Sequence, residues 1–384
     1  PKRRRSTYYA IAGTSAARLG KRREALELTA ASIRTDPTSW ARYRNLAGVV
    51  RSCLRRPPRG APAGRARVVE DRSAHSPSEH QPGGMHGVVI TFNRPESLSR
   101  VIDNLAGAGL TSLTIVDNAP SEASRAVAVA AATRLAVTYV PMEENSGPAG
   151  GIAEGMGRVL AGAASDDDWI VLLDDDGIPG PPGTIGVLRD FGEWLIARGA
   201  PVGAVGLAGA MFDARRGQLV RPSDEELSGP ITVSYVAGNQ LPTIRVASAR
   251  KIGVFDADLF FGFDDLDYCL RLGRGGYGVY ASGPVWLAHR RNVGRIGPAV
   301  GPPPRRENAW RRYYAVRNHI VIMRRYTTWS RALAVTAGHL FWRPISDLLR
   351  RRPGVRGLVR AGTRGCVDAW ANRLGRRVEP TPGS

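Results

Sequence analysis

The sequence has few cysteines, and they show none of the patterns of a cysteine-based site. Only Cys53, Cys269 and Cys366 occur among its 384 residues, and they stand far apart. This spacing gives neither a zinc site nor a disulfide framework, so we expect a reducing, cytoplasmic setting. A run of about 18 apolar residues and a signal-peptide pattern are both absent, which predicts a chain that does not span a membrane.

Acidic residues are scarce at both ends of the chain, although the middle is acidic. Residues 1–84 contain 18 basic and 6 acidic side chains, and residues 301–384 contain 18 and 4. Residues 85–300 contain 18 basic and 24 acidic side chains, so the net charge of +20 comes from the ends. This distribution favours an enzyme core with basic appendages, and no nucleic-acid partner is expected because no binding motif is present. A non-catalytic basic protein that binds membrane or nucleic acid is the alternative.

Residues 1–52 are predicted to be helical and resemble part of a tetratricopeptide repeat. Gly20, Ala25 and Pro37 have the spacing of that repeat. One repeat pair cannot bury its own apolar face, so we expect either a remnant or an arm that docks elsewhere. Residues 53–85 are rich in Pro, Gly and Arg and are predicted to be a linker.

Strand and helix patterns alternate from residue 86 onwards. Short β-branched runs such as GVVITF, LTSLTIVDN and WIVLLDDD are each followed by a turn and a helical pattern. This alternation predicts an α/β domain over residues 86–300, with a mainly parallel sheet and helices on both faces. Ligands of such sheets bind at the carboxyl ends of the strands. Residues 301–384 are predicted to add basic, aromatic helices.

An acidic triplet follows one of these strands. In DDDWIVLLDDDG, Asp174, Asp175 and Asp176 stand directly after an apolar run. Like charges at the end of a buried strand repel each other and resist desolvation. A divalent cation would offset that cost: two carboxylates can share it, or one can bind it while the other accepts from a ribose hydroxyl. The triplet 166–168, which precedes the strand, is interpreted instead as a solvated turn.

A second acidic cluster follows an aromatic loop. Asp264 and Asp265 in FFGFDDLDYCLRL stand at the beginning of a predicted helix. Helix capping alone explains one acid, since exposed amides at a helix N-terminus favour anions. The aromatic loop favours another role, because a carboxylate set against apolar walls has a raised pKa and can act as a general base.

Two further features are weaker signals. His289 in VWLAHRR is placed at the end of a predicted strand, and a lone histidine is more often structural than a ligand. The glycines of ENSGPAGGIAEGM precede a helix, where the backbone can approach a phosphate or a sugar. This stretch matches neither the Walker pattern nor the dinucleotide fingerprint cleanly.

The ordered set of motifs resembles the inverting family-2 nucleotide-sugar glycosyltransferases, in particular the bacterial branch of rhamnosyl- and galactofuranosyltransferases. The set comprises VVITFNRPE, IVDN, ENSGPAGG, LLDDDG, GVFDADLFFGFDDLDYCLR and the downstream His289, within roughly residues 87–330. The resemblance implies a GT-A fold. It also implies transfer of a sugar from a UDP- or dTDP-linked donor to a hydroxyl of a glycan, lipid-linked or small-molecule acceptor. A nucleotidyltransferase is the alternative enzyme, but it would need a basic Gly-rich loop where the chain has TFNRPE.

The resemblance also implies a role for each site residue. The nucleotide-sugar is expected to contact Thr91, Asn93, Arg94, Asp117, Asn118, Asn145, Gly147, Gly150, Gly151, Asp174 and Asp175. Asp174, Asp176 and His289 are the expected ligands of Mn²⁺ or Mg²⁺. Asp265 is the expected catalytic base, and Asp264 is expected to contact acceptor or donor sugar. The C-terminal helices are expected either to hold the enzyme at the anionic inner face of a membrane or to pack on the catalytic domain.

Overall fold

Eight strands form one sheet in the order β3-β2-β1-β4-β9-β5-β10-β8. The computed structural model describes residues 83–293 and 308–380, except residues 106, 179, 182 and 351. The strands are β1 (Met85–Thr91), β2 (Ser112–Asp117), β3 (Val137–Pro141), β4 (Trp169–Asp174), β5 (Val202–Gly206), β8 (Pro230–Val233), β9 (Thr243–Arg245) and β10 (Gly278–Ser282). Only β8 and β9 run antiparallel to their neighbours in this sheet. The predicted α/β architecture with a mainly parallel sheet is therefore confirmed.

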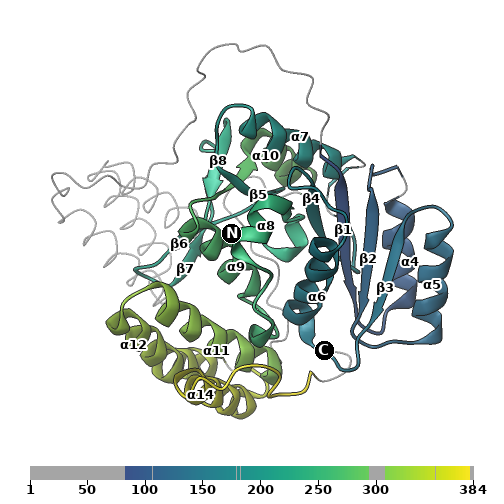
Figure 1. Ribbon diagram of the computed structural model, residues 1–384. Coiled ribbons are helices and arrows are strands. Elements are labelled where there is room, and N and C mark those ends of the chain that lie inside the picture. Colours follow the sequence, from purple (N-terminus) through teal and green to yellow (C-terminus); the bar gives the residue numbers. More distant parts are fainter. Residues whose placement is uncertain are drawn as a thin grey trace, which may run out of the picture. The chain divides into compact units, whose positions relative to one another are not determined.

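Helices cover both faces of the sheet (Figure 1). One face packs against α4 (Pro95–Asn104), α5 (Glu122–Ala132) and α7 (Thr184–Ile196), and the other against α6 (Gly147–Ala161), α8 (Val246–Ile252) and α9 (Asp264–Arg274). Alternate residues of β4 serve the two cores, with Trp169 and Val171 on the first face and Ile170 and Leu172 on the second. Each such buried aliphatic side chain stabilises the fold by about 1.5–3 kcal/mol.

The register of β1 brings three predicted site residues to one edge of the sheet. Thr91 pairs with Asp117 of β2, and Ile90 pairs with Asp174 of β4. Because all three strands are parallel, their carboxyl ends meet at this edge. The loops that follow these strands therefore surround a common space, as the strand pattern predicts.

The part of the chain beyond β10 differs from the expectation. The predicted strand before His289 ends at Ser282, and His289 lies in a helix, α10 (Gly283–Asn292). Pro284 in the first turn of α10 explains the change, since proline is favoured at the first helical positions and carries no N–H for a strand ladder. A small hairpin of β6 (Met211–Asp213) and β7 (Gln218–Val220) lies outside the main sheet.

The C-terminal helices pack on α6 and on the aromatic loop at residues 259–261, within the same compact unit. They are α11 (Ala309–Tyr326), α12 (Trp329–Ala337), a π-helical turn η3 (Gly338–Trp342), α13 (Arg343–Leu349) and α14 (Val355–Trp370). Helix α11 packs against α14 and buries Trp310, Tyr313 and Tyr314 beside Phe260. Of the two arrangements expected for the C-terminal helices, α11 thus adopts the one in which it packs on the α/β domain. Among the described helices, none is long and apolar enough to cross a bilayer.

The helical arm predicted over residues 1–52 and most of the linker predicted over 53–85 lie outside the described residues. The boundaries of the domains at 86–300 and 301–384 stay predictions.

The acidic triplet before β4 is more than a solvated turn. Asp168 is largely buried and accepts hydrogen bonds from the backbone N–H of Gly84 (2.6 Å) and of Ser165 (2.7 Å), and its other contact is His86 Nε2 at 3.1 Å. Asp166 forms an exposed ion pair with Arg250. Asp168 therefore fixes the beginning of β1 to the beginning of β4, whereas Asp166 lies at the surface.

We expect Asp168→Asn to lower the free energy of unfolding by about 1–3 kcal/mol at pH 7, because the amide keeps only one acceptor oxygen and turns an NH₂ group towards the second N–H donor. Asp166→Asn, the matched control, should change it by less than about 1 kcal/mol, as exposed ion pairs do. Urea unfolding of both variants measures the difference.

The effect of Asp168 should also depend on pH. Burial raises the pKa of Asp168, but hydrogen bonds from Ser165, His86 and Gly84 outweigh it and lower the pKa below its ordinary value. A depressed pKa stabilises the folded state above the unfolded pKa of about 3.9, and the gain is lost as the pH falls through the folded pKa. Equal unfolding curves for wild type and Asp168→Asn at pH 7 would contradict this role.

Candidate functional site

Asp175 organises the turn after β1. Its carboxylate accepts hydrogen bonds from Thr91 Oγ1 (2.8 Å) and from the backbone N–H of Phe92 (3.4 Å), and Arg94 approaches it to 3.4 Å. Asn93 in the same turn has a φ of +54°. The buried side chain of Asp175 thus positions Thr91 and Arg94, which, like Asn93 between them, are predicted to contact the nucleotide-sugar.

Asp117 lies fully buried at the end of β2. It accepts hydrogen bonds from the Tyr139 hydroxyl (2.9 Å) and from the backbone N–H of Ala119 (3.0 Å). Burial of Tyr139, followed by its hydrogen bond to Asp117, raises the pKa of Tyr139 to about 12, so the hydroxyl keeps its proton and donates. The carboxylate predicted to contact the base is therefore held in place by β3.

The loop before α6 is tied to the end of β2 by two asparagines. Asn118 donates to the carbonyl of Gly147 (3.2 Å) and accepts from the backbone N–H and the hydroxyl of Ser146. Asn145 Oδ1 accepts from the backbone N–H of Gly147 at 2.9 Å. Both predicted contact residues therefore shape this loop through hydrogen bonds to its backbone.

The glycines of this loop permit close packing. Gly147 has a φ of +69°, and a Cβ there would lie 2.3 Å from the carbonyl oxygen of Phe260. A Cβ on Gly151 would lie 2.9 Å from Ile90, and one on Gly150 would lie 2.5 Å from the Cβ of Ser146. The loop thus packs directly on β1 and on the aromatic loop that precedes Asp264. Two motifs more than 100 residues apart in the sequence meet here.

Asp174 is surrounded by other carboxylates. Burial, and then the charges of Asp176, Asp175 and Asp265, raise the pKa of Asp174 to about 6. Asp176, by contrast, is exposed. Neither Asp174 nor Asp176 has a hydrogen-bond or ion-pair partner among the described residues. Their oxygens are the ones at this edge that remain open to a cation or a ligand.

Asp265 lies at the N-terminus of α9 and contacts the turn η1 (Gly238–Gln240). The backbone N–H groups of Gly238 (3.1 Å) and Leu266 (2.8 Å) donate to its two oxygens, and Tyr235 hydrogen-bonds to it as well. A Cβ on Gly238 would lie 4.0 Å from Asp174 Oδ1. The backbone of Gly238 therefore lies between the carboxylates of Asp265 and Asp174 and is close to both.

Asp264 and Asp265 form a coupled pair of acids. Burial raises the pKa of both, and the neighbouring charge of Asp265 raises that of Asp264 further. The N–H and hydroxyl donors on Asp265 stabilise its charged form. Asp265 is thus the member of the pair that is more readily ionised and so available to receive a proton, and Asp264 is the member that more readily keeps its proton.

Tyr235 is a further residue at this site, and no sequence motif indicated it. Burial, followed by the charge of Asp265, raises the pKa of Tyr235 well above its ordinary value, so its hydroxyl stays protonated and donates. The segment VSYVAGNQ carries no motif for such a role. Only the fold brings it to α9.

The turn after β4 fits a divalent cation through two ligands. Asp174 and Asp176 supply carboxylate oxygens, the donors that Mn²⁺ and Mg²⁺ prefer, and a cation would offset the crowding of charge around Asp174. The predicted third ligand does not join them. Among the described residues no three His, Cys, Asp or Glu side chains are gathered as a metal-binding group. His289 lies in the last turn of α10, next to Arg290, which pairs with Asp224.

Two buried residues of α11 hold the aromatic loop in place. Asn318 Nδ2 donates to the carbonyls of Leu259 (2.8 Å), Phe261 (3.0 Å) and Gly262 (2.8 Å). Arg317 donates to Leu259 as well (2.9 Å), and both side chains are fully buried. The basic segment YYAVRNHIVIMRRY did not indicate these residues, because it is typical of an exposed surface. The helical spacing that places Arg317 on one face with Tyr313, Tyr314 and Ile320 does indicate that Arg317 is buried.

Comparison with known proteins points to one family. Residues 88–191 match the family model described as glycosyl transferase family 2. Galactofuranosyltransferase GlfT1 of Mycobacterium tuberculosis is 30% identical over 201 residues, which cover 49% of this chain and 64% of that protein. The chain thus matches less than two thirds of the length of this curated relative.

Solved structures also show similarity, at low identity. S. aureus TarS 1–349 in complex with UDP is 14% identical, with a TM-score of 0.38, over 78% of this chain and 95% of that one. Glucosyl-3-phosphoglycerate synthase from Mycobacterium tuberculosis, in complex with Mn²⁺ and UDP-glucose, is 19% identical, with a TM-score of 0.24, over 32% and 42%.

We expect Gly147→Ala to destabilise the fold by about 1–3 kcal/mol, because alanine is strained at positive φ and its Cβ would clash with Phe260. Gly157→Ala is the matched control in the same helix. A Cβ there meets nothing within 4 Å, so alanine should stabilise the helix by about 0.5–1 kcal/mol. Thermal or urea unfolding measures both, and an equal gain in stability at the two positions would show that the loop does not need glycine at 147.

Proposed function

Because the chain carries a glycosyltransferase family 2 domain over residues 88–191, we propose that it is a metal-dependent inverting glycosyltransferase. It transfers a sugar from a UDP- or dTDP-linked donor to a hydroxyl group of a glycan, a lipid-linked glycan or a small molecule. The observation that supports this most directly is the position of Asp265. Its carboxylate lies across Gly238 from Asp174, so a proton acceptor and a donor-binding carboxylate share one site.

In the proposed reaction, Asp265 accepts the proton of the acceptor hydroxyl. The oxygen then attacks the anomeric carbon from the face opposite the nucleoside diphosphate, and the diphosphate leaves. Gly238, Leu266 and Tyr235 keep Asp265 oriented, and they favour its charged form before the proton arrives. Asp264, beside it, is placed to donate a hydrogen bond to a sugar hydroxyl when it is protonated.

The donor is proposed to lie along the carboxyl ends of β1, β2 and β4. Thr91, Asn93 and Arg94 would contact the base or the diphosphate, and Asp117 would contact the base. Asp175 and Asn118 support these contacts through the hydrogen bonds that position the two loops. Gly147, Gly150 and Gly151, with Asn145, shape the wall of the sugar-nucleotide pocket.

Asp174 and Asp176 are the proposed holders of Mn²⁺ or Mg²⁺. A cation bound there would supply positive charge to the leaving diphosphate. Magnesium commonly uses one or two carboxylates together with substrate phosphates, so a site of two aspartates needs no third protein ligand. His289 is therefore left out of the proposed metal site.

The enzyme is also proposed to work on the cytoplasmic side of a membrane, in peripheral contact with anionic lipid. The basic, aromatic C-terminal region supports this part of the proposal, since lipid-linked acceptors are presented at such a surface.

We expect Asp265→Asn to lower kcat by about 10²- to 10⁴-fold, the usual contribution of a general base, while donor affinity stays nearly unchanged. Release of nucleoside diphosphate and titration calorimetry with UDP- and dTDP-sugars measure the two quantities. Tyr235→Phe removes one donor to Asp265 and should lower kcat less, again without a change in donor affinity. Substantial turnover by Asp265→Asn would refute the assignment of the base.

We expect Asp176→Ala to weaken donor binding in the presence of Mn²⁺ by about tenfold or more, because loss of an outer-sphere partner of a metal already costs about 10- to 100-fold in affinity. Donor binding in EDTA should be little affected. Asp166→Ala is the control, since Asp166 lies at the opposite end of β4. If Mn²⁺ strengthens donor binding equally in both variants, Asp176 is not a ligand.

A further inference from the structure

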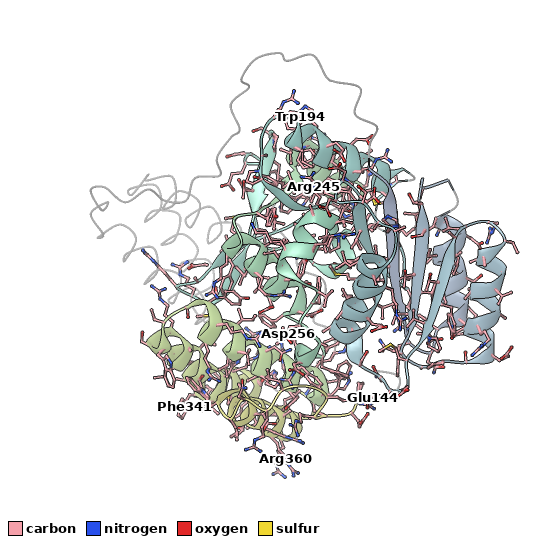
Figure 2. All side chains as sticks on the ribbon, in the orientation of Figure 1. Glu144, Trp194, Arg245, Asp256, Phe341 and Arg360 are labelled. Carbon is pink, nitrogen blue, oxygen red and sulfur yellow. The ribbon has the colours of Figure 1, made fainter. Side chains whose placement is uncertain are left out.

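An apolar stripe runs along the outer side of η3 and α13. Its members are Phe341, Trp342, Ile345, Leu348 and Leu349, spaced as one face of a helix. Trp342 is 76% exposed and Leu349 is 78% exposed, so these side chains project from the surface. Figure 2 shows Phe341 at the outer edge of the C-terminal helices. An amphipathic helix normally turns such a face towards a core, so the stripe needs a partner outside the described residues.

The helices α12 to α14 expose no acidic side chain. Across the span of α12 to α14 the only acidic residues are Asp347 and Asp368, and both are buried. Asp347 pairs with Arg312 (2.9 Å), and Asp368 accepts from the Tyr313 hydroxyl (2.7 Å). Their charges are thus taken up inside the protein.

Three arginines on or next to α13 and α14 have exposed side chains. Arg350 directly follows Leu349, and Arg356 and Arg360 lie on α14, which packs against both η3 and α13. The guanidinium groups of these three arginines make no hydrogen bond or ion pair with the described residues. Arg360 points away from the sheet (Figure 2). This surface therefore combines protruding apolar side chains with unneutralised positive charge.

We propose that the stripe and its three arginines form a docking surface for an anionic phospholipid bilayer. Aromatic and aliphatic side chains enter the boundary between headgroups and acyl chains, while arginines pair with lipid phosphates. A protein partner would have to supply both acidic groups and a deep apolar groove for five projecting side chains. A bilayer accepts projecting side chains without a preformed groove, so the geometry favours lipid.

The docking surface is mechanically connected to the proposed catalytic acids. His339 of η3 hydrogen-bonds to His319 of α11, with Nε2 and Nδ1 3.0 Å apart. The ring of His319 stacks on Phe263, the residue before Asp264, with ring centroids 5.3 Å apart. Asn318 holds the rest of the loop. A docked enzyme would therefore keep Asp264 and Asp265 at a constant height above the lipid. That height would serve a membrane-borne acceptor, and this part of the inference rests on the proposed function.

Vesicle flotation of the full chain tests the docking surface. Wild type should float with vesicles of phosphatidylcholine and phosphatidylglycerol, but poorly with phosphatidylcholine alone, and salt should weaken binding. Since residues 1–84 also carry a net positive charge, variants of the stripe decide where the lipid binds. Leu348→Ser with Leu349→Ser should weaken binding about tenfold or more, as loss of buried apolar groups predicts. Arg356→Gln with Arg360→Gln should weaken it about tenfold or more.

Val129→Ser is the matched control, because Val129 is 65% exposed on α5 and should leave vesicle binding unchanged. Donor binding and melting temperature should stay at wild-type values in all these variants, which separates a failure of docking from a failure of the proposed function. Asp265→Asn should conversely still float. Unchanged flotation of both double variants would overturn the proposal. The proposal would also be overturned if wild type, but not the stripe variants, formed a dimer or a complex with an acidic protein.

Discussion

Carboxylates from two distant parts of the chain share a half-buried space at the edge of the sheet, and the rest of the site depends on that crowding. Asp174 arrives at the end of β4, and Asp265 arrives at the beginning of α9. Gly238 lies between them and donates its N–H to Asp265. Without donors or a cation, burial of these charges would destabilise the fold. Hydrogen bonds stabilise the charge on Asp265, whereas Asp174 and Asp176 have no hydrogen-bond or ion-pair partner among the described residues.

The acid pair is kept in place from behind by the C-terminal helices. Phe260 and Phe263 have φ values of +59° and +66°, a region that costs a residue with a side chain about 1–3 kcal/mol. Asn318 offsets this strain because its amide donates to three carbonyls of the loop. Helix α11 therefore supports the loop that precedes Asp264, and the exposed stripe on η3 and α13 belongs to the same packed layer.

Local sequence patterns predicted the strands and helices well where the hydrophobic periodicity agreed with the turn and helix-stop residues. The strands up to β4 and the helices between them follow from β-branched runs, turn residues and glycine stops. The position of the acids also followed, because parallel strands bring their carboxyl ends to one edge. The same reasoning failed at His289. The apolar residues before it show no clear hydrophobic periodicity, and Pro284 lies in the first turn of a helix where a strand was predicted. It also treated the triplet 166–168 as solvated, since nothing local reveals that Asp168 meets Gly84.

The sequence by itself determined the alternation of strands and helices, the edge at which ligands bind, and the residue types that a sugar-nucleotide and a cation would need. Local periodicity and turn chemistry encode these features, because they involve neighbours along the chain. Only the tertiary structure decided which oxygens are already engaged, as those of Asp117 are with Tyr139. It also placed Tyr235 at Asp265 and Asn318 against the loop before Asp264, and it left the stripe at Trp342 exposed while it buried Arg317. Hydrogen bonds between residues far apart in sequence depend on packing, and no local pattern specifies them.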